Sequence, residues 1–242
     1  MKQFKGYVSK IETFATADGP GIRTVVFLAG CTLRCLYCHN PDMWKQDQSL
    51  AYSVDELMSK IIRMKPYFKG GGGVSFCGGE PLYQSEFLIE VLKKCKEEGI
   101  HTVLDTAGVG NSQYFEEVLE YTDLILLDIK GVNEENYLQL TQKKESTAKQ
   151  FLEVAISKQK PMWIRHVIIP NINDTKEHVK KLYDVIKDIP LVEKVELLPY
   201  HTLGNTKYEK INEAYPLEGV PALEIEVLQQ LQTYLDDLMQ NK

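Results

Sequence analysis

The sequence predicts an α/β fold in which parallel strands alternate with helices. Two observations predict it. Short apolar, β-rich runs recur along the chain with helix-period segments between them. The polar residues that stand out fall at or just beyond the carboxyl ends of these runs, where parallel α/β folds build their active sites. A chain of 242 residues can bury one such core, so we expect a single domain over residues 1–242.

Each predicted strand is an apolar run that ends in turn-forming or charged residues. The first run, residues 23–29, is apolar enough to be buried on both faces. Strands joined through helices pair in parallel by right-handed crossovers, so we expect all the runs to share one sheet. The six predicted strands are residues 23–29, 74–77, 101–104, 124–127, 162–169 and 195–198.

The predicted helices follow from apolar periodicity and from their caps. Ser53 with Glu56 forms a capping box that begins a helix running to Arg63. Gly99 stands where a C-cap glycine ends the helix 84–98. Further helices are predicted at 113–121, at 133–160 with a break near 143–144, at 176–187 and at 223–239.

Composition excludes several classes of protein. The formal net charge of -6 and the dispersed basic residues argue against a nucleic-acid binder. No run approaches a membrane-spanning length, and the amino terminus lacks a signal-peptide pattern, so we expect a cytoplasmic protein without membrane contact. Five cysteines, three of them in one loop, do not resemble a disulfide framework.

Three cysteines follow the first predicted strand in a C-x3-C-x2-C pattern: Cys31, Cys35 and Cys38. Cysteine thiolates are the usual ligands of iron–sulfur clusters, and three of them leave one iron of a cubane open for a non-protein ligand. Structural zinc is the main alternative, but it needs a closed ligand set with a second cysteine or histidine pair. His39 is a fourth ligand in principle, and a redox disulfide is a third interpretation. We expect Cys77 and Cys95 to be core residues.

Other polar residues share this edge of the predicted sheet. Two adjacent glycines at a strand end let the backbone approach a ligand closely. His101, His166 and His178 have no partners at metal-ligand spacing, so we expect them to be structural or surface residues. The sets at strand ends are Gly78 to Glu80, Asp105 with Thr106, Asp128 with Lys130, and His201.

The cysteine motif, with Tyr37 directly before its last cysteine, resembles the radical S-adenosylmethionine (SAM) superfamily. Within it, the chain is most similar to the activating enzymes of pyruvate formate-lyase. The resemblance implies a partial (β/α)6 barrel. Residues 41–53 hold no cysteine-rich insert, which favours this branch over activases that carry one. The segments that carry the resemblance are residues 18–23, 30–40, 75–80, 104–106, 127–130 and 197–201.

The resemblance implies a set of ligands. Cys31, Cys35 and Cys38 would hold a 4Fe–4S cluster whose open iron binds SAM. A monovalent cation, Na⁺ or K⁺, would lie beside SAM. Ala107 departs from the pattern, because a polar residue is expected there. The implied SAM contacts are Tyr37, Cys38, His39, Gly79, Asp128, Ile129, Lys130, Arg165 and His201, and the implied cation ligands are Asp105, Thr106, Leu126 and Asp128.

The implied activity is that of an oxidoreductase. A 5'-deoxyadenosyl radical made from SAM would take a hydrogen from a glycine of pyruvate formate-lyase, and the loop from Asp18 to Gly21 would receive that glycine segment. The resemblance also implies flavodoxin or ferredoxin as the electron donor and a monomeric enzyme. Three alternatives stay open: activation of another glycyl-radical enzyme, a radical SAM reaction on a small molecule, and a non-catalytic electron carrier, although a carrier normally supplies four protein ligands.

Overall fold

The computed structural model describes residues 4–46 and 51–240. These residues form two compact units, and each unit is described by itself. The first unit is Met1–Thr32, Met43–Leu127 and Ser146–Met162, and the second is Leu33–Asp42, Asp128–Glu145 and Trp163–Lys242.

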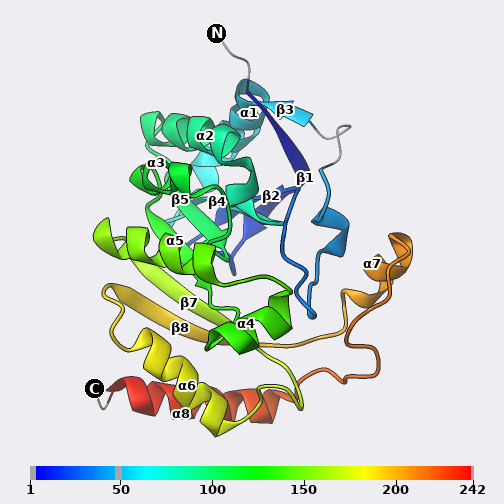
Figure 1. Ribbon diagram of the computed structural model, residues 1–242. Helices are drawn as coiled ribbons and strands as arrows, with labels where there is room; N and C mark the ends of the chain where they lie inside the picture. Colours follow the sequence, from blue (N-terminus) through cyan, green and yellow to red (C-terminus); the bar gives the residue numbers. More distant parts are fainter. Residues whose placement is uncertain (1–3, 47–50, 241–242) are drawn as a thin grey trace. The chain divides into compact units, whose positions relative to one another are not determined.

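The first unit is built on a mostly parallel sheet (Figure 1). Its strand order is β3-β1-β2-β4-β5-β6. The strands β2, β4, β5 and β6 pair in parallel, as the sequence predicts, whereas β1 is antiparallel to both β2 and β3. The sheet does not close on itself. The strands are β1 (Lys5–Ala15), β2 (Arg23–Leu28), β3 (Ala51–Ser53), β4 (Gly73–Gly78), β5 (His101–Thr106) and β6 (Leu124–Asp128).

Helices follow one another along one side of these strands (Figure 1). The predicted capping box of the first helix is confirmed, because Glu56 N–H donates to Ser53 Oγ and Ser53 N–H donates to the Glu56 carboxylate. Gly99, with a φ of 63°, follows the second helix in the left-handed conformation. These helices are α1 (Val54–Met64), α2 (Ser85–Glu97), α3 (Phe115–Glu120) and α5 (Ser146–Ser157).

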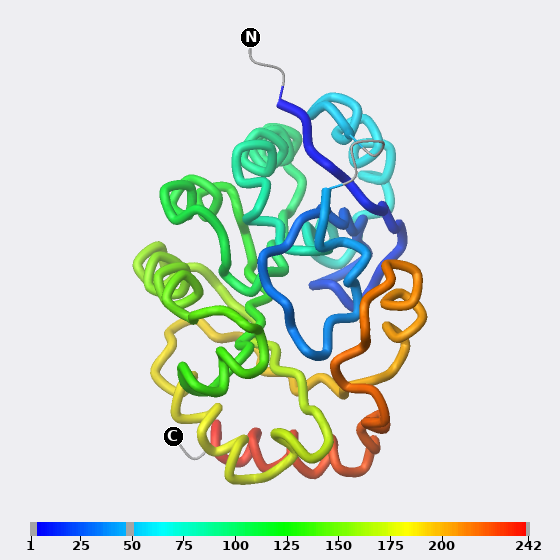
Figure 2. Tube along the Cα trace, turned by 45° about the vertical axis from the view of Figure 1, so that its right-hand side comes forward, coloured from blue at the N-terminus to red at the C-terminus, as the bar shows by residue number. Residues whose placement is uncertain are grey.

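The second unit combines two neighbouring strands with helices. The helices α6 and α8 lie side by side in both views of the chain (Figures 1 and 2). Its elements are α4 (Glu134–Thr141), β7 (Met162–Ile168), α6 (Lys176–Ile186), β8 (Val192–Pro199), α7 (Asn205–Lys210) and α8 (Ile225–Gln240). Short 3-10 helices occur at Pro41–Met43, Lys65–Tyr67, Pro81–Gln84 and Ser112–Tyr114.

All six predicted strands are present, but β1, β3 and α7 were not predicted. The strand β1 mixes charged and apolar residues without a strict alternation, since it lies near the edge of the sheet and is only partly buried. The strand β3 has three residues and α7 has six, so neither is long enough to show a period. The predicted break near 143–144 is confirmed between α4 and α5.

The two faces of the first unit's sheet differ in polarity. In the parallel register, Val26 pairs with Phe76 and Phe76 with Leu104, so one face is apolar. Successive residues of a strand point to opposite faces. The other face mixes polar residues, among them Ser75 and Asp105, with apolar ones such as Val25 and Val103.

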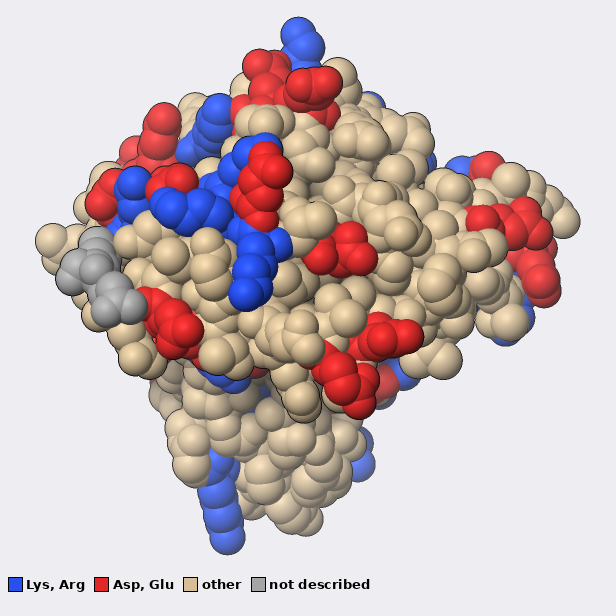
Figure 3. All heavy atoms as spheres, turned by 90° about the horizontal axis from the view of Figure 1, so that it is seen from below, with Lys and Arg blue, Asp and Glu red and all other residues tan. Residues whose placement is uncertain are grey.

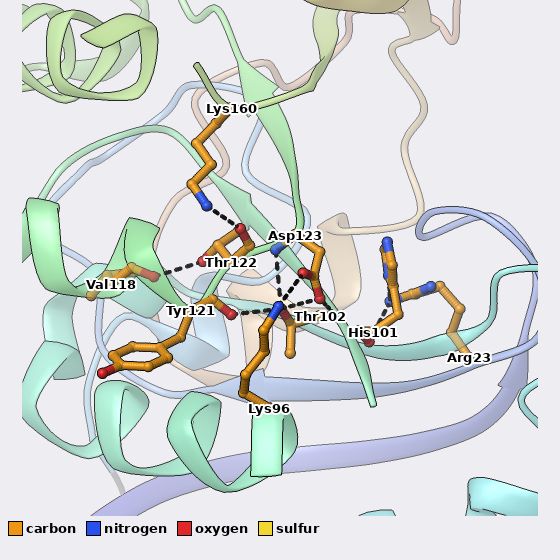
Figure 4. A network of polar contacts seen from close by, with 9 residues as sticks. All are labelled: Arg23, Lys96, His101, Thr102, Val118, Tyr121, Thr122, Asp123 and Lys160. Atoms are coloured by element: carbon orange, nitrogen blue, oxygen red, sulfur yellow. Dashed lines mark hydrogen bonds and ion pairs between the residues drawn. The ribbon is translucent and has the colours of Figure 1, made fainter. Parts of the chain in front are cut away.

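Arg23 is a fully buried cation on this mixed face. Its Nε donates to Ser75 Oγ at 2.6 Å, and its terminal nitrogens donate to the carbonyl oxygens of Pro20, Gly71, Val74 and His101. Figure 4 shows its guanidinium directed toward the His101 ring. Burial lowers the pKa of Arg23 to about 10, against the opposing effect of nearby carboxylates. Arg23 thus ties the loop before β2 to the starts of β4 and β5.

The beginnings of β5 and β6 are joined by a second polar network (Figure 4). The Asp123 carboxylate accepts from Thr102 N–H at 2.9 Å and from Lys96 Nζ at 3.2 Å. The Thr102 hydroxyl donates to the Tyr121 carbonyl, and Lys160 donates to the Thr122 carbonyl. This end of the sheet is therefore fixed by side chains as well as by the strand pairing.

Charged side chains of both signs are interspersed on the face shown in Figure 3. Exposed ion pairs such as Lys180 with Asp184 and Lys181 with Glu177 follow the helical spacing of α6. Within the described part of the chain, no helix has the length and apolarity needed to cross a membrane.

The Arg23→Met variant tests the contribution of the buried guanidinium. We expect the free energy of unfolding to fall by about 3 kcal/mol or more, because several buried carbonyl oxygens would lose their donor. Urea unfolding followed by circular dichroism measures this change. The exposed Lys69 next to the same loop offers a matched control, and Lys69→Met should change stability by less than about 0.5 kcal/mol. Equal effects of the two substitutions would contradict this role of Arg23.

Candidate active site

The first cysteine is held by backbone hydrogen bonds of the first unit. Directly after β2, Gly30 N–H donates to the Met43 carbonyl at 2.7 Å and Cys31 N–H donates to the Trp44 carbonyl at 3.1 Å. Gly30 has a φ of 102°, a conformation that favours glycine. The chain therefore turns sharply between the strand and Cys31.

Gly79 lies against this turn. A Cβ atom at position 79 would lie 2.4 Å from the Gly30 carbonyl oxygen and 2.9 Å from that of Met43. Only glycine permits so close an approach of two backbones. Gly79 N–H donates to the Leu28 carbonyl and Glu80 N–H donates to the Gly30 carbonyl, both at 2.8 Å. The β2–β4 pairing thus continues into the loop that carries Cys31.

Glu80 holds the next strand end. This buried carboxylate accepts from the Thr106 hydroxyl at 2.5 Å and from Ala107 N–H at 2.9 Å. It also accepts from Leu82 N–H at 3.1 Å. These contacts orient the loop that contains Gly78 and Gly79, called the glycine loop below. Position 107 contributes its backbone N–H, so this contact does not need a polar side chain there.

The other two cysteines belong to the second unit. Arg34 N–H and Leu36 N–H, on either side of Cys35, donate to the carbonyls of Thr141 and Leu140 at the end of α4. Cys38 N–H donates to the Cys35 carbonyl at 3.1 Å. Cys35 is buried and Cys38 is partly buried, and both are reduced cysteines outside any disulfide, as is Cys31.

Lys130 is the cation of the second unit's site. Its Nζ lies 2.8 Å from Asp128 Oδ2 and 5.5 Å from the centre of the Tyr37 ring. Burial lowers the pKa of Lys130, but the Asp128 carboxylate, Tyr37 and Cys35 outweigh it and raise the pKa well above its ordinary value. Burial raises the pKa of Cys35 to about 12 and also raises the pKa of Tyr37, while Lys130 opposes both shifts. Lys130 therefore favours the deprotonated form of Cys35 and of Tyr37.

His39 and His201 form a stacked pair. Their ring centres lie 3.7 Å apart at an interplanar angle of 9°, and His39 Nε2 lies 3.1 Å from the His201 carbonyl oxygen. Because a carbonyl oxygen only accepts, Nε2 carries the proton and is not a metal-ligating atom here. Burial, and then His201, lower the pKa of His39 to about 4. The His39 ring is therefore neutral at physiological pH.

Three tyrosines, Tyr200, Tyr208 and Tyr215, form a group near Cys38. Only Tyr200 was singled out from the sequence, as part of the segment 197–201. The hydroxyls of Tyr200 and Tyr215 lie 2.7 Å apart, and the rings of Tyr208 and Tyr215 meet edge to face at 4.8 Å. Burial raises the pKa of Tyr208, and the nearby Cys38 raises it further. These tyrosines form an apolar, uncharged wall beside the cysteine.

Not all predicted site residues come together. Asp18 precedes β2, whereas Cys31 follows it, so the two lie at opposite ends of a strand about 20 Å long. Asp105 and Thr106 are adjacent on β5 and direct their side chains to opposite faces. The Thr106 hydroxyl also accepts from Gly108 N–H at 2.9 Å. Among the described residues, no group of three or more His, Cys, Asp or Glu is placed to hold a single metal ion.

The remaining predicted contacts lie in the second unit. Ile129 N–H donates to the Arg165 carbonyl at 2.9 Å. The Arg165 side chain is buried, and its Nε lies 3.5 Å from a carboxylate oxygen of Glu196. The second unit therefore brings Tyr37, the segment from Asp128 to Lys130 and Arg165 into one connected set of contacts.

The donor set fits an iron–sulfur cluster. The three cysteines of the motif are thiols free of any disulfide, and thiolate is the ligand that iron–sulfur clusters require. Metal binding displaces the thiol proton, and the cation Lys130 favours that loss at Cys35. The loop therefore carries three soft donors, and within the second unit Lys130 favours the thiolate form of Cys35.

Comparison with known proteins identifies the family. The sequence-family model of the Radical SAM superfamily matches residues 25–186. The chain belongs to the radical SAM superfamily, whose members use a 4Fe–4S cluster and SAM. This membership favours an iron–sulfur cluster over the alternatives of structural zinc and a redox disulfide.

Individual relatives are similar over nearly the whole chain. The pyruvate formate-lyase-activating enzyme of Clostridium pasteurianum is 51% identical over 236 residues, which cover 97% of this chain and 99% of that protein. The enzyme of the same name from Listeria monocytogenes is 43% identical and covers 94% and 95%. A crystal structure of a domain of the pyruvate-formate lyase-activating enzyme from Bacteroides vulgatus has 28% identity and a TM-score of 0.56, and covers 69% of this chain and 94% of that one.

The Gly79→Ala variant tests the close approach at the cysteine turn. The added Cβ must displace the backbone at Gly30, next to Cys31, so we expect a loss of about 2 kcal/mol in unfolding free energy and less iron after reconstitution. Urea unfolding and iron analysis measure the two effects. Gly99→Ala is the matched control, because nothing lies within 4 Å of its Cβ and only its φ of +63° is unfavourable. Gly99→Ala should keep full iron content; equal iron loss in both variants would contradict the interpretation.

Proposed function

We propose that this chain is an activating enzyme for pyruvate formate-lyase. The observation that carries the proposal is similarity over almost the full length of both chains to proteins of that name, at 51% and 43% identity. The cysteine-rich insert that would favour activases of another kind is missing from residues 41–53. When bound, the reduced cluster and SAM supply a 5'-deoxyadenosyl radical that takes a hydrogen from a glycine of the partner.

The residues of this chain bind and orient the two cofactors. Cys31, Cys35 and Cys38 are the proposed cluster ligands. Lys130 is the proposed partner of the SAM carboxylate, and Asp128 lies near the sulfonium. This assignment is supported by charge complementarity, because the two side chains are held 2.8 Å apart on one strand end.

The remaining proposed SAM contacts surround this charged pair. Gly79 offers its backbone to the amino group, which its close packing against Gly30 supports. Tyr37, His39 and His201 are proposed around the adenine, and the stacked histidine rings offer a flat surface for a base. Ile129 contributes backbone, and Arg165 a donor to the ribose or carboxylate.

A monovalent cation, Na⁺ or K⁺, is proposed beside SAM at Asp105, Thr106, the Leu126 carbonyl and Asp128. The Thr106 side chain points to the face opposite Asp105, where its hydroxyl contacts Glu80 and Gly108, so the proposed contribution of Thr106 is a backbone oxygen. Carboxylate and carbonyl oxygens are ligands that hard cations prefer.

The proposed partners follow from the same family. Flavodoxin or ferredoxin is the proposed electron donor, pyruvate formate-lyase the protein substrate, and the enzyme is proposed to act as a cytoplasmic monomer. Asp18 remains a proposed contact of the partner. Its position before β2 supports a docking contact rather than a role at the hydrogen transfer.

Electron paramagnetic resonance tests the function. The anaerobically reconstituted, reduced protein is mixed with SAM and pyruvate formate-lyase. We expect a glycyl-radical doublet on the partner, and its loss in Cys35→Ala because one cluster ligand is gone. Cys95→Ala is the control, since Cys95 contacts Met58 in the core and lies outside the motif. Formation of 5'-deoxyadenosine without the doublet would favour another glycyl-radical enzyme or a small molecule as the substrate.

The Asp18→Asn variant tests the docking contact separately. The expected result is a KM for pyruvate formate-lyase about tenfold higher, because a charged contact would be lost, with SAM affinity unchanged. Initial rates of glycyl-radical formation at varied partner concentration measure it. An unchanged KM would assign Asp18 a structural role, in which its carbonyl accepts from Ser75 Oγ at 2.6 Å.

A further inference from the structure

Ile129, which lies between Asp128 and Lys130, is held at its N–H and at its carbonyl by two consecutive residues of β7. Ile129 N–H donates to the Arg165 carbonyl at 2.9 Å. The Ile129 carbonyl accepts from His166 Nδ1 at 2.6 Å. The Ile129 carbonyl belongs to the peptide group that enters Lys130, and the Ile129 N–H belongs to the one that leaves Asp128. His166 therefore fixes the peptide to Lys130, and the Arg165 carbonyl fixes the peptide from Asp128.

The contact with Ile129 determines the tautomer of His166. A carbonyl oxygen has no proton to donate, so His166 Nδ1 carries the hydrogen, and in the neutral ring Nε2 is then an acceptor. Asn173 leads to the same result. Its Oδ1 accepts from Ile169 N–H at 2.6 Å, so the atom 3.3 Å from His166 Nε2 is its amide nitrogen, a donor.

His178, at the beginning of α6, completes the chain of contacts. Its Nε2 lies 3.0 Å from His166 Nε2, and the two rings lie 5.1 Å apart at an angle of 22°. Because His166 Nε2 is an acceptor, His178 Nε2 carries the hydrogen and donates it. The order of donation is therefore His178 to His166 to the Ile129 carbonyl.

Both rings are suited to remain neutral. His166 is only 2% exposed. Burial, followed by the effect of His178, lowers the pKa of His166 to about 4, and burial lowers that of His178 to about 4. A proton added to His166 Nε2 would face two donors. The directions of these hydrogen bonds therefore hold across the neutral pH range.

We propose that His166, supported by His178 and Asn173, positions the SAM-binding segment from Asp128 to Lys130. The inference rests on the proposed function of that segment. The chain of contacts runs from α6 through the Ile129 carbonyl to the Lys130–Asp128 pair and on to the Tyr37 ring, 5.5 Å from Lys130 Nζ. His166, His178 and Asn173 act through Ile129 and touch no reacting atom.

Two substitutions at one position separate this role from simple packing. In His166→Asn the amide nitrogen takes the place of Nδ1, so the donor to Ile129 is kept. In His166→Gln the polar end takes the place of Nε2, so that donor is lost. We expect His166→Gln to raise the SAM dissociation constant about tenfold, and His166→Asn to keep it within about twofold of the unchanged protein.

The supporting contact is tested by a second pair. His178→Gln keeps an N–H donor where His178 Nε2 lies, whereas His178→Leu removes it. We expect weaker SAM binding, about threefold or more, only in His178→Leu. Urea unfolding of all four variants shows whether each is folded and how much stability it has lost.

Two measurements test the proposal. Equilibrium dialysis of radiolabelled SAM against the reconstituted protein gives the dissociation constants without the partner enzyme. Nitrogen-15 NMR of histidine-labelled, cofactor-free protein shows the tautomers directly, with Nδ1–H expected for His166 and Nε2–H for His178.

The proposal would be overturned if His166 carried its hydrogen on Nε2, or if His166→Gln and His166→Asn were folded and bound SAM equally well. Equal weakening by both would likewise assign His166 to packing. None of these results depends on pyruvate formate-lyase. If the SAM constants change as expected and no glycyl radical forms, the positioning role stands and the proposed partner is wrong.

Discussion

The parallel pairing of β2 with β4 is the constraint on which the first unit's part of the site depends. Leu28 pairs with Gly78 at the last position of the two strands. The next hydrogen bonds, from Gly79 to Leu28 and from Glu80 to Gly30, extend the same pairing into the loops. Because a side chain at position 79 would collide with the Gly30 carbonyl, the absence of a Cβ is what brings Cys31 and the glycine loop to one place.

In the second unit, one partly buried ion pair has the corresponding importance. Removing Lys130 from water alone would be costly, and Asp128 compensates for that cost at 2.8 Å. The same cation lowers the pKa of Cys35 against the larger effect of burial. A proposed site for thiolates and a zwitterionic ligand gains from a positive charge whose position is set before either binds.

The sequence predicted the strands of the parallel sheet because buried strands are long apolar runs, and it predicted α1 because its capping box is local. It did not predict β1, whose polar residues follow from its partial exposure. The His166–His178 contact was missed for another reason: the two residues lie on β7 and α6, and nothing local marks a hydrogen bond between them. The position of Asp18, by contrast, can be read from the sequence. Asp18 precedes the predicted strand 23–29 and the cysteines follow it, so they belong to opposite ends of the sheet.

Glu80 and His166 hold the backbone where it leaves β5 and β6. Strand pairing ends at such places, so buried backbone groups there need other partners. Glu80 accepts from the N–H groups of Leu82 and Ala107, and His166 donates to the Ile129 carbonyl. Each of these side chains supplies the missing hydrogen-bond partner of a backbone group and fixes that peptide group in one orientation. The backbone next to the proposed SAM contacts is therefore preorganised by buried polar groups, which a substitution that conserves only volume would not replace.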